Sequence, residues 1–310
     1  MLTPALAALA SIRLVAFDLD GTLLTPSHRV STRTKLALQS LSARGVEMVI
    51  ATGRSTPAVT DIAASLGLPR PLHCVVYNGG CCVTLPPSSG PAAAAPQQPE
   101  IIFEDTLTPD AAAAVLALAA AHSLATQYYV HEKIYVHCCE PSHDAHVATY
   151  KQLTGCAHTY VEPDYAEAVT AGRPHKMLVL TDDPDALCAA AAAAGLADAH
   201  GITVVRGSPP FFCEFLAGSK GNGLEKLCAY LGVDAATSVA AFGDGDNDRE
   251  MLGAVKLGIA MANARDSVKR AADRVSALPN SEDGVAHELE LLEAEGVFGE
   301  LADGVGGKSY

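Results

Sequence analysis

Two carboxylates stand two positions apart in the stretch VAFDLDGTLL at 15–24. Asp18 and Asp20 follow an apolar run directly, and Gly21, which permits a sharp turn, comes next. Carboxylates this close repel each other unless positive charge lies between them. They therefore suit a divalent cation with hard oxygen ligands, usually Mg²⁺, or a nucleophile with a neighbouring acid. Because the apolar run and the turn accompany the pair, the stretch predicts a site rather than two solvated loop carboxylates.

Two further segments offer groups that suit a phosphoryl ligand. Thr52 and Gly53 follow the apolar run VIA, and they supply a hydroxyl and a backbone N–H that could hold phosphoryl oxygens. Lys220 lies in AGSKGNGL, just before a predicted helix. Its ammonium could counter a phosphate, or neighbouring carboxylates, at the positive end of that helix.

A last acidic segment, AAFGDGDND, follows another predicted strand. Asp244 and Asp248 are one helical turn apart in it, with Asn247 between them. This spacing brings the two carboxylates to one side of the turn, where both can face one cation. Each segment alone could be a helix cap or a solvated charge, but together they predict one site.

The elements around these residues explain how they could meet. Apolar runs at 12–17, 46–52 and 72–78 predict buried strands, and periodic segments at 32–44 and 57–66 predict the helices between them. Alternating strands and helices predict right-handed βαβ units in a doubly wound parallel sheet. Ligands of such sheets bind at the carboxyl ends of the strands, where the polar residues lie.

A different pattern interrupts this alternation of strands and helices. The stretch 85–99 is rich in Pro and Ala and predicts a loop, and Ala-rich helices with antiparallel strands follow it. The alternation of predicted strands and helices resumes after Lys220. We therefore expect a catalytic core at 1–83 and 207–310, and an inserted α+β domain at 84–206.

Composition restricts the partners. The chain of 310 residues has 35 acidic and 21 basic residues, a net charge of −14, which argues against nucleic acid or an anionic membrane surface. No apolar run reaches the roughly 18 residues that a membrane span needs. Nine cysteines without a CxxC pair indicate reduced thiols, so we expect a cytoplasmic protein, with an organelle such as a plastid as the alternative. The sequence leaves monomer and homodimer open.

The order DLDGT, ATGR, SKG and FGDGDNDREML resembles the haloacid dehalogenase (HAD) superfamily, specifically its Cof-type branch (type IIB). The segment 261–289 is similar to the closing segment of that branch. The resemblance implies an α/β fold with a Rossmannoid parallel-sheet core and an inserted α+β cap domain of the C2 type. The chain between Asp18 and Thr52 is too short for a cap, whereas the chain between Thr52 and Lys220 is long enough.

The resemblance also implies a role for each motif residue. Asp18 would attack the phosphorus and form an aspartyl-phosphate, and Asp20 would protonate the leaving alcohol and then deprotonate water. Mg²⁺ would be held by the carboxylates of Asp18 and Asp244 and the backbone carbonyl of Asp20, with Asp248 supporting that shell. Thr52 and Lys220 would share in catalysis. The phosphoryl oxygens would be bound by Leu19, Thr52, Gly53, Lys220 and Asn247.

The order Asp-Leu-Asp distinguishes between the reactions that members of the superfamily catalyse. P-type ATPases of the superfamily carry Lys directly after the nucleophile, and haloacid dehalogenases lack the second Asp. We therefore expect a Mg²⁺-dependent phosphatase acting on small organic phosphate monoesters, with sugar phosphates favoured. Phosphates of FMN or of the riboflavin pathway are the alternative substrates, and a phosphomutase or a non-catalytic phosphometabolite-binding protein is the alternative class. Six basic residues fall in the cap, where some could line the cleft and select the substrate, although each alone is more often a surface residue: His131, Lys133, His137, Arg173, His175 and Lys176.

Overall fold

The computed structural model describes residues 12–94, 98–130, 133–138, 140–207 and 211–298. It divides into two compact units. The first comprises Met1–Phe103 and Lys220–Tyr310, and the second is the continuous segment Glu104–Ser219. Among the described residues, no helix combines the length and the apolar character that a transmembrane span requires.

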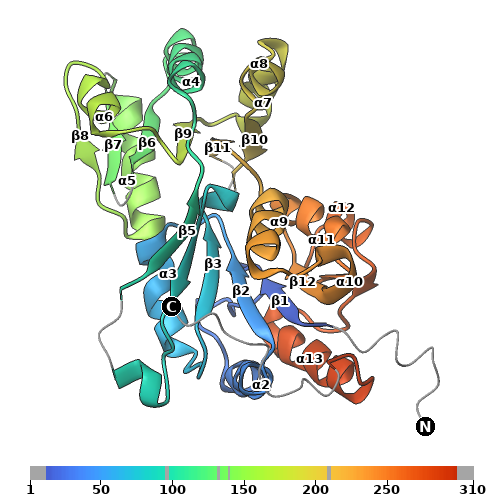
Figure 1. Cartoon of the computed structure of the whole chain (residues 1–310). Helices are drawn as coiled ribbons and strands as arrows, with labels where there is room; N and C mark the ends of the chain where they lie inside the picture. Colours follow the sequence, from blue (N-terminus) through green and yellow to red (C-terminus); the bar gives the residue numbers. More distant parts are fainter. Residues whose placement is uncertain (1–11, 95–97, 131–132, 139, 208–210, 299–310) are drawn as a thin grey trace. The chain divides into compact units, whose positions relative to one another are not determined.

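The first unit is built on an eight-stranded sheet of order β14-β13-β12-β1-β2-β3-β4-β5 (Figure 1). The strands from β14 to β3 in this order pair in parallel, and β4 pairs with β3 in antiparallel fashion. The expected doubly wound parallel sheet is confirmed. The strands are β1 (Leu14–Phe17), β2 (Glu47–Ala51), β3 (Leu72–Val76), β4 (Cys81–Leu85), β5 (Glu100–Glu104), β12 (Val239–Gly243), β13 (Leu257–Ala260) and β14 (Arg274–Val275).

The central strand β1 is buried along its whole length, with β12 on one side and β2 on the other. Burial on both faces explains why its sequence, LVAF, is apolar without alternation. Leu14 and Ala16 join a core cluster with residues of the helices α9 (Lys220–Leu231) and α11 (Arg249–Ala254). The side chains of Val15 and Phe17 therefore point to the opposite face of the sheet.

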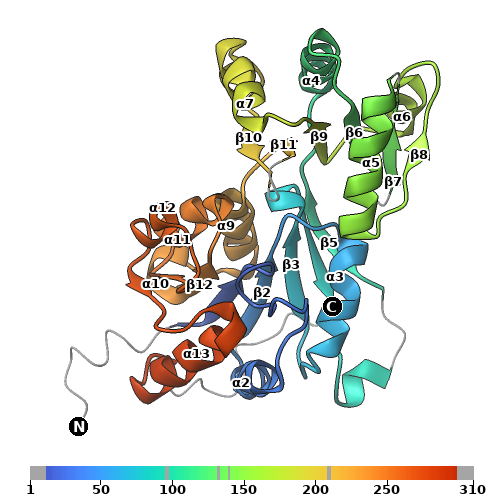
Figure 2. The same ribbon diagram turned by 180° about the vertical axis from the view of Figure 1, so that it is seen from behind.

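Helices α2 (Thr32–Ala43) and α13 (Gly284–Ala294) lie side by side in both views of the molecule (Figures 1 and 2). Arg33 of α2 forms a bidentate ion pair with Glu290 of α13. The other helices of this unit are α3 (Thr56–Ser65), α10 (Ala235–Ser238) and α12 (Asp266–Lys269), and its 3₁₀ turns are η1 (Tyr77–Gly79), η2 (Pro91–Ala94), η3 (Asp246–Asp248) and η4 (Asn280–Glu282).

The second unit has a six-stranded sheet of order β10-β11-β9-β6-β7-β8, in which only the pair β7 and β8 is parallel. One face packs against helices α4, α6, α7 and α8, and Tyr150 of α5 reaches Tyr129 on the other face. The strands are β6 (Thr126–Val130), β7 (Lys133–Val136), β8 (Thr159–Tyr160), β9 (Lys176–Leu180), β10 (Thr203–Arg206) and β11 (Phe212–Leu216). The helices are α4 (Pro109–Ala121), α5 (Pro141–Thr154), α6 (Ala166–Ala171), α7 (Pro184–Ala193) and α8 (Leu196–His200).

Both boundaries between the two units lie later in the chain than the sequence pattern predicts. The expected boundaries lay at residues 83/84 and 206/207, whereas the structural units meet at Phe103/Glu104 and Ser219/Lys220. The first difference arises because β4 and β5, on either side of the Pro/Ala-rich stretch, extend the sheet of the first unit. The second arises because β11 pairs with β9 and β10 in the sheet of the second unit.

Candidate active site

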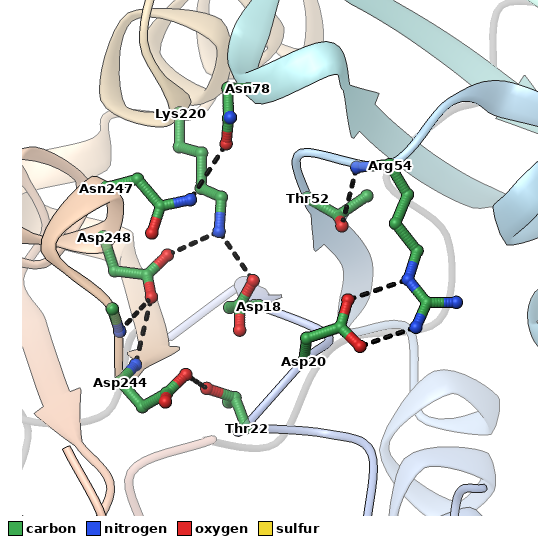
Figure 3. A network of polar contacts seen from close by, with 11 residues as sticks. Asp18, Asp20, Thr22, Thr52, Arg54, Asn78, Lys220, Asp244, Asn247 and Asp248 are labelled. Atoms are coloured by element: carbon green, nitrogen blue, oxygen red, sulfur yellow. Dashed lines mark hydrogen bonds and ion pairs between the residues drawn. The ribbon is translucent and has the colours of Figure 1, made fainter. Parts of the chain in front are cut away.

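The site lies at the carboxyl ends of two neighbouring parallel strands, β1 and β12 (Figure 3). Asp18 directly follows β1, and its N–H donates to the carbonyl of Phe242 in β12 at 3.0 Å. Asp244 directly follows β12, and Asp248 ends the 3₁₀ turn beyond it. Side-chain oxygens of these three aspartates all lie within 4.8 Å of one another, so the predicted meeting of distant acids at one sheet edge occurs.

Lys220 places a positive charge among these carboxylates. It is the first residue of α9, and its Nζ donates to Asp18 Oδ1 at 2.6 Å and to Asp248 Oδ1 at 2.7 Å. Burial by itself would lower the pKa of Lys220, but the two carboxylates outweigh this effect and raise the pKa above its ordinary value. The ammonium therefore stays charged and compensates two buried acids.

Asp248 holds the loop that carries Asp244. Its Oδ2 accepts the backbone N–H groups of Asp244 at 3.0 Å and Gly245 at 2.9 Å, while its Oδ1 accepts from Lys220. The turn has no room for a larger residue at Gly243, where a Cβ would lie 2.5 Å from the Cβ of Asp248. The side chain of Asp248 therefore fixes both the loop and the lysine.

Negative charge remains in excess after Lys220 is counted. Burial raises the pKa of Asp18 well above its ordinary value, against the opposing charge of Lys220, and Asp248 and Asp244 raise it further. Burial and then the charge of Asp248 raise the pKa of Asp244 to about 6. Thr22 partly offsets this by donating its hydroxyl to Asp244 Oδ1 at 3.1 Å. Keeping three close carboxylates ionised beside a single ammonium costs free energy, because the negative charges repel one another. A bound cation would lower that cost.

The side chains of the site suit a metal ion, and Gly21 leaves room for one of them. Gly21 has a φ of +87°, and a Cβ at this position would lie 2.2 Å from Asp244 Oδ2. Glycine therefore lets the Asp244 carboxylate lie close against the turn after β1. Within the described residues, Asp18, Asp244 and Asp248 are the one group of this kind, and hard carboxylate oxygens suit a divalent cation such as Mg²⁺.

The phosphoryl-binding candidates gather around the end of β2. Thr52 is buried, and its backbone is held by β3, since its N–H donates to the Val75 carbonyl at 2.8 Å. The backbone N–H of Asn78 donates to the Thr52 carbonyl at 2.9 Å, and Asn247 Nδ2 donates to Asn78 Oδ1, also at 2.9 Å. Asn78 therefore connects the Thr52 loop with the Asn247 turn.

Asn78 is a site residue that the sequence reasoning missed. It has a φ of 53°, a left-handed conformation that asparagine adopts more readily than most residues. A Cβ at Gly53 would lie 2.9 Å from its side-chain amide, so the two residues fit closely. The signal was present in the sequence as the Asn78-Gly79 pair at the end of the predicted third strand, a typical turn pattern.

The other predicted residues lie as follows. Leu19 is fully buried, so only its backbone is suited to binding a polar ligand. The Asp20 carboxylate points to the guanidinium of Arg54 and is not part of the three-carboxylate group (Figure 3). Arg54 stands in the quoted ATGR motif but was assigned no role in the sequence analysis.

Most of the basic cap candidates are engaged within the second unit. His175 Nε2 lies 2.6 Å from Glu104 Oε1, and buried Lys176 lies 3.6 Å from Glu214 Oε2. Arg173 donates to backbone carbonyls, His137 contacts a backbone carbonyl, and Lys133 is exposed. His131 lies outside the described residues.

Comparison with known proteins identifies the family of the chain. A family model described as haloacid dehalogenase-like hydrolase matches residues 15–289, and the chain belongs to this family. A Streptococcus pyogenes protein is 30% identical over 282 residues, which cover 90% of this chain and 97% of that protein. The HMP-PP phosphatase of an Enterobacter species is 30% identical over 260 residues, which cover 81% and 85%.

A solved structure confirms the fold class. The crystal structure of a haloacid dehalogenase-like hydrolase from Bacteroides thetaiotaomicron matches with a TM-score of 0.70 and 27% identity, over 91% of this chain and 99% of that one. The Cof-type resemblance is confirmed, and the protein is a phosphatase of the HAD superfamily.

Proposed function

We propose that the protein is a Mg²⁺-dependent phosphatase that hydrolyses small organic phosphate monoesters through an aspartyl-phosphate on Asp18. The observation that supports this most directly is the position of Asp18. Its carboxylate lies close to those of Asp244 and Asp248 and receives a hydrogen bond from the Lys220 ammonium. A carboxylate nucleophile that attacks an anionic phosphate needs positive charge around it, which Lys220 and a cation held by the acids would supply.

The first half-reaction transfers the phosphoryl group to the protein. A carboxylate oxygen of Asp18 attacks the phosphorus, the bond from phosphorus to the ester oxygen breaks, and Asp20 gives that oxygen a proton. Lys220 holds Asp18 in one orientation at 2.6 Å. When bound by Asp18, Asp244 and the Asp20 backbone carbonyl, Mg²⁺ would neutralise charge on the transferring group.

The second half-reaction restores the protein. Water gives a proton to Asp20 and attacks the phosphorus, the bond to Asp18 breaks, and inorganic phosphate leaves. Throughout both steps the phosphoryl oxygens are bound by the Thr52 hydroxyl, the Lys220 ammonium, the Asn247 amide, and backbone N–H groups of Leu19 and Gly53. Asp248 takes no direct part and keeps Lys220 and the Asp244 loop in place.

Sugar phosphates are the substrates we propose, and the second unit, acting as a cap, would provide the specificity. HMP-PP and FMN belong in any test, the first because the Enterobacter relative is named for it. We also propose a reducing compartment, the cytoplasm. No disulfide joins the described cysteines, although Cys188 Sγ and Cys213 Sγ lie only 3.1 Å apart.

The decisive experiment is phosphate release from a panel of sugar phosphates, nucleotides, FMN and HMP-PP, with Mg²⁺ and with EDTA. Asp18→Asn should abolish release, and Asp61→Asn, a change to an exposed residue of α3, should not. The rank order of substrates identifies the class. Release that persists in Asp18→Asn or in EDTA would contradict the proposal, and an isomerised phosphate ester as product would indicate a mutase.

A further inference from the structure

Arg54 holds both carboxylate oxygens of Asp20 (Figure 3). Its Nε donates to Asp20 Oδ2 at 2.7 Å and its Nη2 donates to Oδ1 at 2.5 Å. A bidentate contact between a guanidinium and a carboxylate fixes direction as well as distance. The contact matters because the side chain of Asp20 is 47% exposed, and its other basic neighbour, His28, is more distant, with Nδ1 3.6 Å from Asp20 Oδ1.

Arg54 itself is anchored by the phosphoryl-binding loop. Its backbone N–H donates to Thr52 Oγ1 at 3.2 Å, and its carbonyl accepts the N–H of Tyr77 at 3.0 Å. Thr52 continues β2, and Tyr77 follows β3. The guanidinium therefore extends from a loop that two neighbouring strands hold in place. From this fixed position it can hold the Asp20 carboxylate in one orientation.

We propose that Arg54 is a positioning residue that keeps the Asp20 carboxylate on the Thr52 side of the site, in reach of the leaving oxygen. A proton-transfer group works only within hydrogen-bond distance of its partner. While Asp20 carries the proton, one of the two contacts to Arg54 opens and the other holds the side chain in place. Lysine cannot do this equally well, because its ammonium lacks the planar pair of donors.

This inference rests on the proposed role of Asp20, and leaving groups of different acidity test it. A p-nitrophenyl ester needs little protonation as it leaves, whereas an alkyl ester such as a sugar phosphate needs a full proton. Hydrolysis of the aspartyl-phosphate, in which Asp20 also acts, is the same for both esters, so the first half-reaction is measured alone, as leaving-group release in a single turnover. In Arg54→Gln we expect this rate to fall by about 10- to 100-fold for the sugar phosphate, within the range of general acid catalysis. We expect it to change by less than about 3-fold for p-nitrophenyl phosphate, with the half-saturating substrate concentration nearly constant for both.

The matched control is Arg33→Gln, which removes the same bidentate geometry on the surface, between α2 and α13. It should leave both rates unchanged. Arg54→Lys should recover part of the loss with the sugar phosphate. In a double-mutant cycle, adding Arg54→Gln to Asp20→Asn should cost nothing further, because Arg54 acts through Asp20.

Several outcomes would overturn the inference. Equal losses in the single-turnover rate for the two esters would show a structural role, and a rise in the half-saturating concentration alone would show direct substrate binding. A faster single-turnover reaction of the sugar phosphate would show that Arg54 restrains proton transfer by Asp20. Losses that add to those of Asp20→Asn would also exclude action through Asp20. Failure of the proposed function is seen separately, as activity that survives Asp18→Asn.

Discussion

Lys220 and Asp248 form an ion pair at 2.7 Å although the side chain of each is only 1% exposed. Taking two such charges out of water costs several kcal/mol per ion unless their geometry compensates. Here the compensation is shared, since Lys220 also contacts Asp18 and Asp248 also accepts two backbone N–H groups. Lys220, for which we propose a role in catalysis, is therefore a structural residue as well.

Removing Lys220 should reveal this double role. In Lys220→Met the carboxylates of Asp18 and Asp248 lose their cation, so we expect a loss of about 3–5 kcal/mol in the free energy of unfolding. Phosphatase activity should disappear too. Urea denaturation in EDTA measures the first effect. Lys151→Met, a change to an exposed lysine of α5, is the control, and equal stability of the two variants would show that the buried pair contributes nothing.

The raised pKa values of Asp18 and Asp244 predict how pH and metal combine. For an acid whose folded pKa is raised, the stabilisation is complete below the unfolded value of 3.8 and is lost as pH rises through the folded value, which is about 6 for Asp244. Without metal, these two groups should therefore destabilise the fold as pH rises through this window. The proposed Mg²⁺ would bind the ionised carboxylates, so the stabilisation that it gives should grow over the same pH range.

Thermal unfolding with Mg²⁺ and with EDTA at pH 5 and pH 7.5 tests this expectation. The increase in Tm caused by Mg²⁺ should be larger at pH 7.5, and Asp244→Asn should reduce it at both values. An equal increase at the two pH values would mean that protons and metal do not compete for these carboxylates.

Gly21→Ala should weaken metal binding directly. The new Cβ would lie 2.2 Å from Asp244 Oδ2, so the carboxylate would have to move. Gly45→Ala is a matched control, because Gly45 has a similar φ of +90° and the new Cβ would lie 3.9 Å from its nearest neighbour, Arg70 Nη1. Both variants should lose about 1–2 kcal/mol to backbone strain. Only Gly21→Ala should need more Mg²⁺ for half-maximal activity, and a parallel shift in Gly45→Ala would refute the steric explanation.

Asn78 should affect phosphate binding through Asn247. Asn78→Gly keeps the left-handed backbone available but removes the contact to the Asn247 amide. We expect KM to rise about 3- to 10-fold, the effect of losing one hydrogen bond of about 1 kcal/mol, with little change in Tm. Asn78→Ala should show the same KM with a lower Tm. If KM stays at the wild-type value in both, Asn78 does not orient Asn247.

Much of the site could be predicted because its residues follow apolar runs. Strands such as β1 are buried on both faces and therefore read as uninterrupted apolar segments, and Asp18 and Asp244 stand directly after two of them. In a parallel sheet, such positions meet at one edge whatever their separation in sequence. The sequence alone was therefore sufficient to predict that acids far apart in the chain meet at one site.

Other features depended on tertiary contacts that no local pattern encodes. β5 is largely exposed and follows the Pro/Ala-rich stretch, so nothing in its sequence, EIIFE, marked it as a strand of the first sheet. The pairing of Arg54 with Asp20, and of Asn78 with Asn247, depends on how the segments after four different strands approach one another. Motif spacing identifies the groups that do chemistry more readily than the groups that orient them.

The division of the chain into one continuous and one discontinuous unit has a consequence for biosynthesis. The segment Glu104–Ser219 contains all six strands of its own sheet, so it can complete its fold while the ribosome is still adding later residues. Asp18 emerges early but lies 202 positions before Lys220, and Asp244 follows later still. An unfinished chain therefore has no assembled site, and phosphatase activity begins only when translation has passed β12.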